Sequence, residues 1–163
     1  MTRTIMLGVT GVLTGGLLLA SAAVAEPNWK ASPTYATVNL ATGFVPDPWT
    51  QQLSAGGSTE VGGGLAPGCR GRIHEAAPDV DLNYEAGGSH LFVHVESKVD
   101  TSLVIFGPDG RWYCNDDFAS LDPVVVFHNP RSGNYNIWVG VVGDAELADA
   151  ELRITEMNPL DWR

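Results

Sequence analysis

Short runs in which hydrophobic and polar residues alternate dominate the chain from residue 36 onward. Successive side chains of a β-strand point to opposite faces, so this alternation predicts strands with one face in a core, and apolar residues at helical spacing are almost absent. Two clear runs have apolar residues at positions 91, 93 and 95 and at positions 135, 137, 139 and 141. The remaining expected strands are Ala36 to Leu40, Val80 to Tyr84, Ser102 to Phe106, Arg111 to Asn115, Val124 to Phe127 and Ala150 to Ile154.

Clusters of Gly, Pro, Asn and Asp separate nearly all of these runs. About eight or nine short strands, spaced roughly ten residues apart, are typical of two packed antiparallel sheets. The pattern therefore predicts an all-β protein with a two-sheet antiparallel sandwich.

The N-terminus has the pattern of an export signal. Arg3 precedes an apolar stretch from Ile5 to Leu19, and small residues follow at Ala23 and Ala25. The apolar stretch is shorter than the roughly 20 residues that a permanent membrane helix needs. We therefore expect a signal peptide over residues 1–25, cleaved after Ala25, and a secreted or periplasmic protein without a membrane span after cleavage. A retained anchor is the alternative.

A Gly-rich stretch, residues 54–69, divides the rest of the chain. Its composition is too flexible for the interior of a strand, so we expect an N-terminal arm and linker over residues 26–68, a sandwich over 69–156 and a tail over 157–163. The arm contains "GFVPDPW", residues 43–49, in which two prolines forbid a regular ladder. Phe44 and Trp49 in this rigid turn either pack on the sandwich, which we favour, or present a binding edge.

The formal net charge is −10, which argues against nucleic acid and anionic membrane surfaces as partners. Most of the acidic side chains are expected on a solvated surface. The chain has two cysteines, Cys69 and Cys114, and an even number in an exported protein predicts a disulfide. No Cys-x-x-Cys motif supports a redox or zinc site.

Residues 100–118, "DTSLVIFGPDGRWYCNDDF", contain two expected strands joined by a Pro-Asp-Gly turn, which is the chemistry of a hairpin. Antiparallel pairing brings the residue before the first strand next to the residues that end the second. Oxygen ligands gathered at a loop end are what calcium prefers. The sequence thus leaves two readings for this loop, a solvated acidic loop or a calcium site, and the candidate ligands are Asp100, Asn115, Asp116 and Asp117.

The segments "DTSLVIFGPDGRWYCNDD" and "PVVVFHNPRSGNYNIWVGV" resemble the bacterial pre-peptidase C-terminal domain over about residues 69–156. That resemblance implies a jelly-roll-like sandwich, secretion and an accessory or substrate-binding role that is often attached to secreted proteases. Some members bind calcium, and Asp100 and the 115–117 triplet match the acidic loop of the family. The chain departs from the family in its cysteine pair, its "GFVPDPW" arm and the lack of a protease domain.

Other candidate sites carry less chemistry. His90 and His94 share a strand face but lie about 13 Å apart, too far for one metal ion, so we expect both on the solvent face. No nucleophile or zinc-protease motif occurs, and we do not expect an enzyme. Trp138, opposite the apolar face of its strand, either forms an exposed platform for a sugar or protein, or is covered by the N-terminal arm.

Together these features favour a secreted, non-catalytic binding module for an extracellular polysaccharide or protein, with Trp138 and Trp49 as candidate ligand contacts and calcium as a candidate stabiliser. The alternatives are a structural or interaction protein of the cell envelope, or an accessory partner of a secreted protease. The sequence does not specify the ligand or the oligomeric state.

Overall fold

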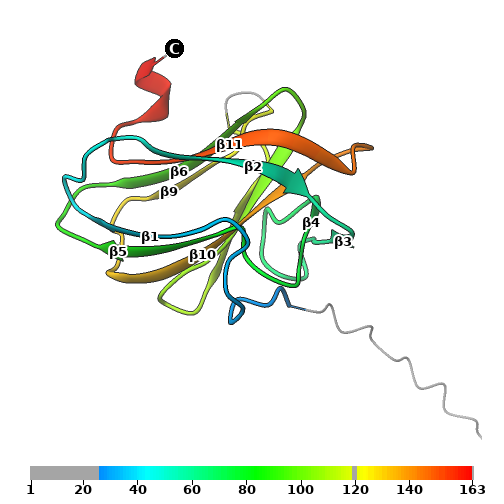
Figure 1. Ribbon diagram of the computed structural model, residues 1–163, viewed down its shortest axis with the longest axis horizontal. Coiled ribbons are helices and arrows are strands. Elements are labelled where there is room, and N and C mark those ends of the chain that lie inside the picture. The colour runs from blue at the N-terminus through cyan, green and yellow to red at the C-terminus, as the bar shows by residue number, and fades with distance from the viewer. Residues whose placement is uncertain (1–25, 119–120, 163) are drawn as a thin grey trace, which may run out of the picture.

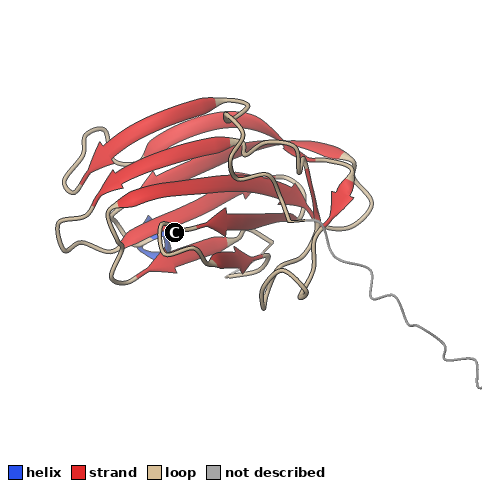
Figure 2. Cartoon of the chain, turned by 90° about the horizontal axis from the view of Figure 1, so that it is seen from below, coloured by secondary structure: helices blue, strands red, loops and turns tan. Residues whose placement is uncertain are grey.

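Eleven β-strands and one short 3-10 helix form the regular structure of residues 26–118 and 121–162, the part of the chain that this computed structural model describes. The expected signal peptide lies outside the described residues. Apart from the helical turn, the described chain is made of strands and loops (Figure 2). The elements are β1 (Ala36–Ala41), β2 (Trp49–Gly56), β3 (Thr59–Glu60), β4 (Arg72–Ile73), β5 (Val80–Glu85), β6 (Leu91–Ser97), β7 (Thr101–Phe106), β8 (Trp112–Asn115), β9 (Val124–Phe127), β10 (Gly133–Val141), β11 (Leu147–Thr155) and η1 (Pro159–Trp162).

The strands form two sheets that pack face to face, which confirms the predicted all-β sandwich (Figure 1). Sheet A has the order β1-β5-β10-β4-β3, with β7 also paired to β10 and β8 paired to β7. Sheet B has the order β2-β11-β6-β9. The described pairings are antiparallel except that between β1 and β5, which is parallel and runs from Ala36 opposite Val80 to Ala41 opposite Glu85.

Strand β10 is the centre of sheet A, because it pairs with β5 along one edge and with β7 along the other. A Cβ atom at Gly140 in this strand would lie 2.4 Å from Ser102 Oγ on β7 and 3.0 Å from the Arg72 carbonyl oxygen on β4. Glycine is therefore needed where three strands approach this closely.

The main core lies between the sheets and is built from the inward positions that the alternation predicts. In β10 these positions are Tyr135, Ile137, Val139 and Val141, each at most 1% exposed. They pack with inward residues of β6 and β11, such as Val93 and Leu152. Since one face of each strand supplies the core, the other faces of the two sheets remain for polar residues or for covering segments.

Residues 26–68 are part of the sandwich, not a separate arm. β1 is an outer strand of sheet A, and β2 pairs with β11 over eight positions, from Leu147 opposite Gly56 to Ile154 opposite Trp49. The expectation that the Gly-rich stretch is too flexible for a strand is wrong for residues 54–56. Leu53 and Ala55 of β2 are buried in the core, and this burial outweighs the poor strand propensity of the small residues that follow.

A second, smaller core lies on the outer face of sheet A. Trp138 is fully buried there together with Val61, Ile73 and Val104. The prediction that Trp138 forms an exposed platform is therefore wrong, and the alternative, a covered face, is the one observed. The cover comes from residues 61–73, whose apolar side chains need a partner outside the main core.

Candidate functional site

The cysteine pair fixes the covering segment to the edge of sheet A. Cys69 and Cys114 form the predicted disulfide, with their Cα atoms 4.7 Å apart. Cys114 belongs to β8, and Cys69 is 6% exposed. The bridge therefore holds residues 61–73 against β8 and also places the next residue, Arg70, beside the acidic loop.

The acidic loop assembles as the hairpin register predicts. Leu103 of β7 lies opposite Asn115 of β8, so Asp100 comes close to the residues that follow β8. Burial raises the pKa of Asp100, and the charges of Asp117 and Asp116 raise it further, while Arg70 lowers it. One carboxylate oxygen of Asp100, Oδ1, is buried without a hydrogen-bond partner.

These residues fit a calcium ion only in part. Asn115 Oδ1 already accepts a hydrogen bond from Val124 N at 2.9 Å, and its Nδ2 donates to the Asp117 carbonyl oxygen at 3.0 Å. Asp116 Oδ2 lies 3.1 Å from Arg70 Nη1 in a salt bridge. Within the described residues no three His, Cys, Asp or Glu side chains are grouped so that they could hold a metal ion. The carboxylates of Asp100 and Asp117 are the remaining candidate ligands of the four.

The predictions for Trp49, His90 and His94 have mixed outcomes. Trp49 is half-buried and packs against the main core, as favoured for the turn that contains it. His90 is exposed, and its Nδ1 lies 2.7 Å from the His128 carbonyl oxygen. His94 is 4% exposed, so the expectation that solvent covers it is wrong. It lies on the outer face of sheet B between Arg153 and Val124, where the strands on both sides reduce its exposure.

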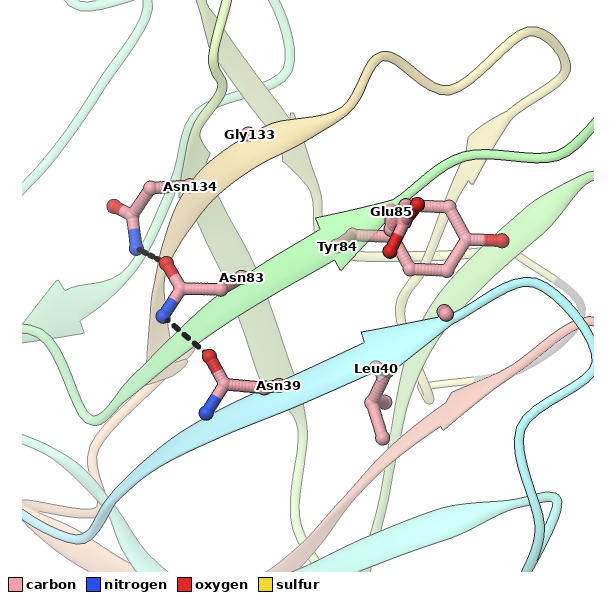
Figure 3. A pocket seen from close by; sticks show the side chains of 8 residues that line it. Asn39, Leu40, Asn83, Tyr84, Glu85, Gly133 and Asn134 are labelled. Carbon is pink, nitrogen blue, oxygen red and sulfur yellow. Dashed lines mark hydrogen bonds between the residues drawn. The ribbon is translucent and has the colours of Figure 1, made fainter.

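A row of three asparagine amides crosses the exposed outer face of sheet A (Figure 3). Asn83 on β5 lies opposite Asn39 on β1 and Asn134 on β10. Asn83 Nδ2 donates to Asn39 Oδ1, and Asn134 Nδ2 donates to Asn83 Oδ1, both at 3.0 Å. The row fixes the three amide planes, so its free donors and acceptors are presented in fixed directions.

The amide row lies in an open depression of about 390 Å³, which Glu85 and Gly133 also line. Two residues further along β5 and β10, Asn136 Nδ2 donates to Asp81 Oδ1 at 2.7 Å. The outer face near this edge of sheet A is therefore polar and hydrogen-bonded across three neighbouring strands.

Aromatic side chains border this polar face. Phe106 on β7 pairs with Asn136 on β10 and therefore points to the same, outer face of the sheet. Trp29 stacks on Phe106, with ring centroids 4.8 Å apart and planes at 25°, and the Trp112 ring contacts Phe106 as well, with centroids 4.8 Å apart. Trp29 is 36% exposed, and Lys30 Nζ lies 4.9 Å from its ring centroid, so the exposed part of this ring beside the polar rows is shared with a cation.

Sequence reasoning missed this face, because Asn39, Asn83 and Asn134 come from three different strands. Each one alone reads as an ordinary solvent-facing residue of an alternating run. The available signal was that three alternating runs all carry Asn near their middle or start, but only the strand order places these residues in one row.

Asp79 is a buried carboxyl group next to the same sheet. It is 5% exposed, and its Oδ2 accepts a hydrogen bond from Val139 N at 2.7 Å. The pairing of β5 with β10 ends at Val80 opposite Ile137, so the carboxylate takes the place of a backbone carbonyl for the next free N–H. Burial raises the pKa of Asp79 to about 7, although the hydrogen bond from Val139 lowers it. Carboxyl groups with a shifted pKa often mark active sites, but Asp79 is enclosed and bonds to a backbone N–H of the sheet, so we assign it a structural role.

No protein-family model matches this chain, and no curated protein is significantly similar to it. The resemblance to the pre-peptidase C-terminal domain therefore stays a prediction. Among residues 26–118 and 121–162, no helix is long and apolar enough to cross a membrane.

Proposed function

We propose that the protein is a secreted, non-catalytic binding module that recognises a neutral polysaccharide on the outer face of sheet A. The observation that carries the proposal is the exposed row of Asn39, Asn83 and Asn134 in an open depression. Export is supported by the signal-like N-terminus and by the disulfide, since disulfides persist in oxidising compartments.

Sugar hydroxyl groups both donate and accept hydrogen bonds, and so does a primary amide. In the row, Asn39 and Asn134 each use one amide group, and Asn83 uses its oxygen toward one neighbour and its nitrogen toward the other. Asn39 Nδ2 and Asn134 Oδ1 lie at its two ends, and Asn83 keeps one N–H and one acceptor lone pair (Figure 3). Because the amides are already oriented, less side-chain entropy is lost when hydroxyls bind to them.

Charge and aromatic surface narrow the class of ligand. The net charge of −10 disfavours acidic glycans, and Glu85 and Asp81 beside the row add to that repulsion. Phe106 stacks on the Trp29 ring and Lys30 Nζ lies 4.9 Å from its centroid, so the C–H face of a sugar ring can stack there when the exposed Lys30 side chain moves aside. A neutral polysaccharide that lies across the strands satisfies both conditions.

The resemblance to an accessory module of secreted proteases is compatible with such a role, because binding to a polymer keeps a partner enzyme close to its substrate. Calcium remains a proposed stabiliser of the Asp100 loop, supported by the buried, unpartnered Oδ1 of Asp100 and by the nearby charges of Asp116 and Asp117. The proposed glycan face does not depend on that ion, since its residues belong to β1, β5 and β10.

The test is a titration of the purified chain with soluble neutral polysaccharides (a β-glucan, a mannan and a xylan), with alginate as an acidic comparison, followed by calorimetry or affinity electrophoresis. We expect binding to at least one neutral polymer and none to alginate. Asn83→Ala removes both hydrogen bonds of the row and should weaken binding by about tenfold, since each such bond contributes about 0.5–1.5 kcal/mol.

Gln52→Ala is the matched control, because Gln52 is an exposed amide on the outer face of sheet B that bonds to Glu151. It should leave binding unchanged. Equal effects of the two substitutions, or no binding to any neutral polymer, would contradict the proposed site.

A further inference from the structure

β1 ends sheet A with an open edge. Alternate N–H and C=O groups of a terminal strand point away from the sheet, and within residues 26–118 and 121–162 no backbone hydrogen bond joins β1 to any strand other than β5. Natural proteins usually protect such an edge with charged residues, proline, a bulge or a very short strand. β1, with the sequence ATVNLA, is six residues long, pairs in regular register and contains no charge and no proline.

The other edge strands of the described sandwich differ from β1 in length or in the bonding of their open side. β2 has eight residues and also carries no charge and no proline, but one of its edge N–H groups is already bonded, because Ser54 N donates to Tyr35 Oη at 3.0 Å. β8 and β9 are four residues long, and β3 has two. Of the two longer edge strands, β1 is therefore the one for which no backbone bond on the open side is seen among the described residues.

The inner face of β1 also remains incompletely covered. Ala36, Val38 and Leu40 point toward the core but are only half-buried, whereas the inward residues of the neighbouring β5 are at most 3% exposed. A further strand beside β1 would cover these apolar side chains. Burial of apolar area and backbone hydrogen bonds both favour that addition.

We propose that the strand that adds to β1 is β1 of a second copy of this chain, in antiparallel orientation. A two-fold axis at Val38 places Val38 of one copy opposite Val38 of the other, Ala36 opposite Leu40 and Thr37 opposite Asn39. Each pair keeps its residues on the correct face, since the paired residue numbers have the same parity. Sheet A of the two copies then continues as one sheet.

The amide row selects this register. Asn83 donates to Asn39 Oδ1, which leaves Asn39 Nδ2 directed away from Asn83, toward the open edge (Figure 3). With the axis at Val38, this donor meets Thr37 Oγ1 of the other copy, and the contact occurs twice by symmetry. With the axis at Asn39, two Nδ2 donors would face each other, which is unfavourable.

Charge permits a copy of the chain at this edge, because the strand itself is uncharged, and it predicts how the dimer responds to salt. Two chains with a net charge of −10 repel each other, but the paired strands themselves carry no charge that would place like charges in contact. Salt screens the long-range repulsion and leaves the strand pairing intact, so the dimer should become tighter as salt is added. Six residues a side is small for an interface, so we expect a weak dimer with a dissociation constant in about the micromolar to millimolar range.

The experiment is sedimentation equilibrium of the chain beginning at Glu26, across a concentration series that spans that range, at low and high salt. We expect a monomer–dimer equilibrium that shifts toward dimer at high salt. Hydrogen exchange of the peptide covering residues 36–41 should slow in the concentrated sample relative to the dilute one. These exchange data locate the contact even if a variant folds poorly.

Thr37→Glu places two carboxylates near the two-fold axis, about 7–8 Å apart across the ladder, and should weaken the dimer by about tenfold or more. Thr50→Glu is the matched control, because Thr50 is also an exposed threonine, on the outer face of β2 in sheet B. It should leave the dimer unchanged. A monomer at every concentration, a dimer that Thr37→Glu does not weaken, or protection outside residues 36–41 would each overturn the proposal.

Discussion

Asp79→Asn measures how much stability the protein loses by enclosing a carboxyl group in sheet A. Asp79 is 5% exposed, and burial raises its pKa from 3.8 to about 7. A shift of one pKa unit corresponds to about 1.4 kcal/mol, so the fully ionised group destabilises the fold by about 4 kcal/mol. Asparagine keeps an acceptor oxygen for Val139 N and carries no charge, so it should remove this loss.

The direction of the pH effect follows from proton binding. Between pH 3.8 and about 7 the folded protein holds the Asp79 proton while the unfolded chain has released it. Stability attributable to this group therefore falls as the pH rises through that window, and the loss is complete above the folded-state pKa. At pH values below the unfolded-state pKa both states are protonated, and the variant and the wild type should differ little.

The assay is urea unfolding followed by tryptophan fluorescence at several pH values from about 4 to 8, with the variant minus wild-type difference as the readout. That difference should grow in favour of Asp79→Asn by a few kcal/mol across the range. Asp109→Asn is the control: burial tends to raise the pKa of Asp109, but hydrogen bonds from Tyr113 Oη and Arg111 N lower it overall. Its contribution is fully present above the unfolded-state pKa, so Asp109→Asn should cause a loss that stays constant over this range. A pH-independent difference for Asp79→Asn would refute the reasoning.

Two further predictions concern the loop and the bridge beside it. Millimolar calcium should raise the melting temperature of the wild type by several degrees. The rise should be larger in Arg70→Ala, because Arg70 no longer competes for Asp116, and it should be absent in the Asp116→Asn, Asp117→Asn double variant. An unchanged melting temperature in both the wild type and Arg70→Ala would mean that the loop is only solvated. Reduction of the Cys69–Cys114 bridge, or its replacement by two serines, should lower the free energy of unfolding by up to about 4 kcal/mol, and a count of two free thiols in the untreated protein would contradict the bond.

The sequence predicted the fold where alternation was regular. Eight of the runs recognised by period two correspond to β1 and to strands from β5 to β11, because most of them supply apolar residues to the main core from one face, and selection for core residues leaves a visible pattern. β2 was missed because Gln51 and Ala55 share its less exposed face with Trp49 and Leu53, so its apolar alternation is weak. β3 and β4 have two residues each, too short for any periodic signal.

The site was predicted less well, for a reason that concerns distance along the chain. The acidic loop could be anticipated because a single tight hairpin brings Asp100 toward Asp116 and Asp117, and hairpin register follows from local sequence. Trp138 was misplaced because alternation tells which face a residue occupies but not whether another segment covers that face. The cover here comes from residues 61–73, which are held by a disulfide between two cysteines 45 residues apart in the sequence.

The amide row and the open β1 edge are consequences of one feature, the parallel addition of β1 to β5. That pairing extends the polar face of sheet A by one strand and makes Asn39 the last amide of the row. It also makes β1 the terminal strand, with Asn39 Nδ2 left at the edge (Figure 3). Because the two-fold axis of an antiparallel strand pair is perpendicular to the sheet, the proposed dimer would present both amide rows on the same side of one continuous sheet. A polymer that contacts one row would then have the second at a fixed and short distance, so a weak dimer and a weak glycan site would reinforce each other through effective concentration.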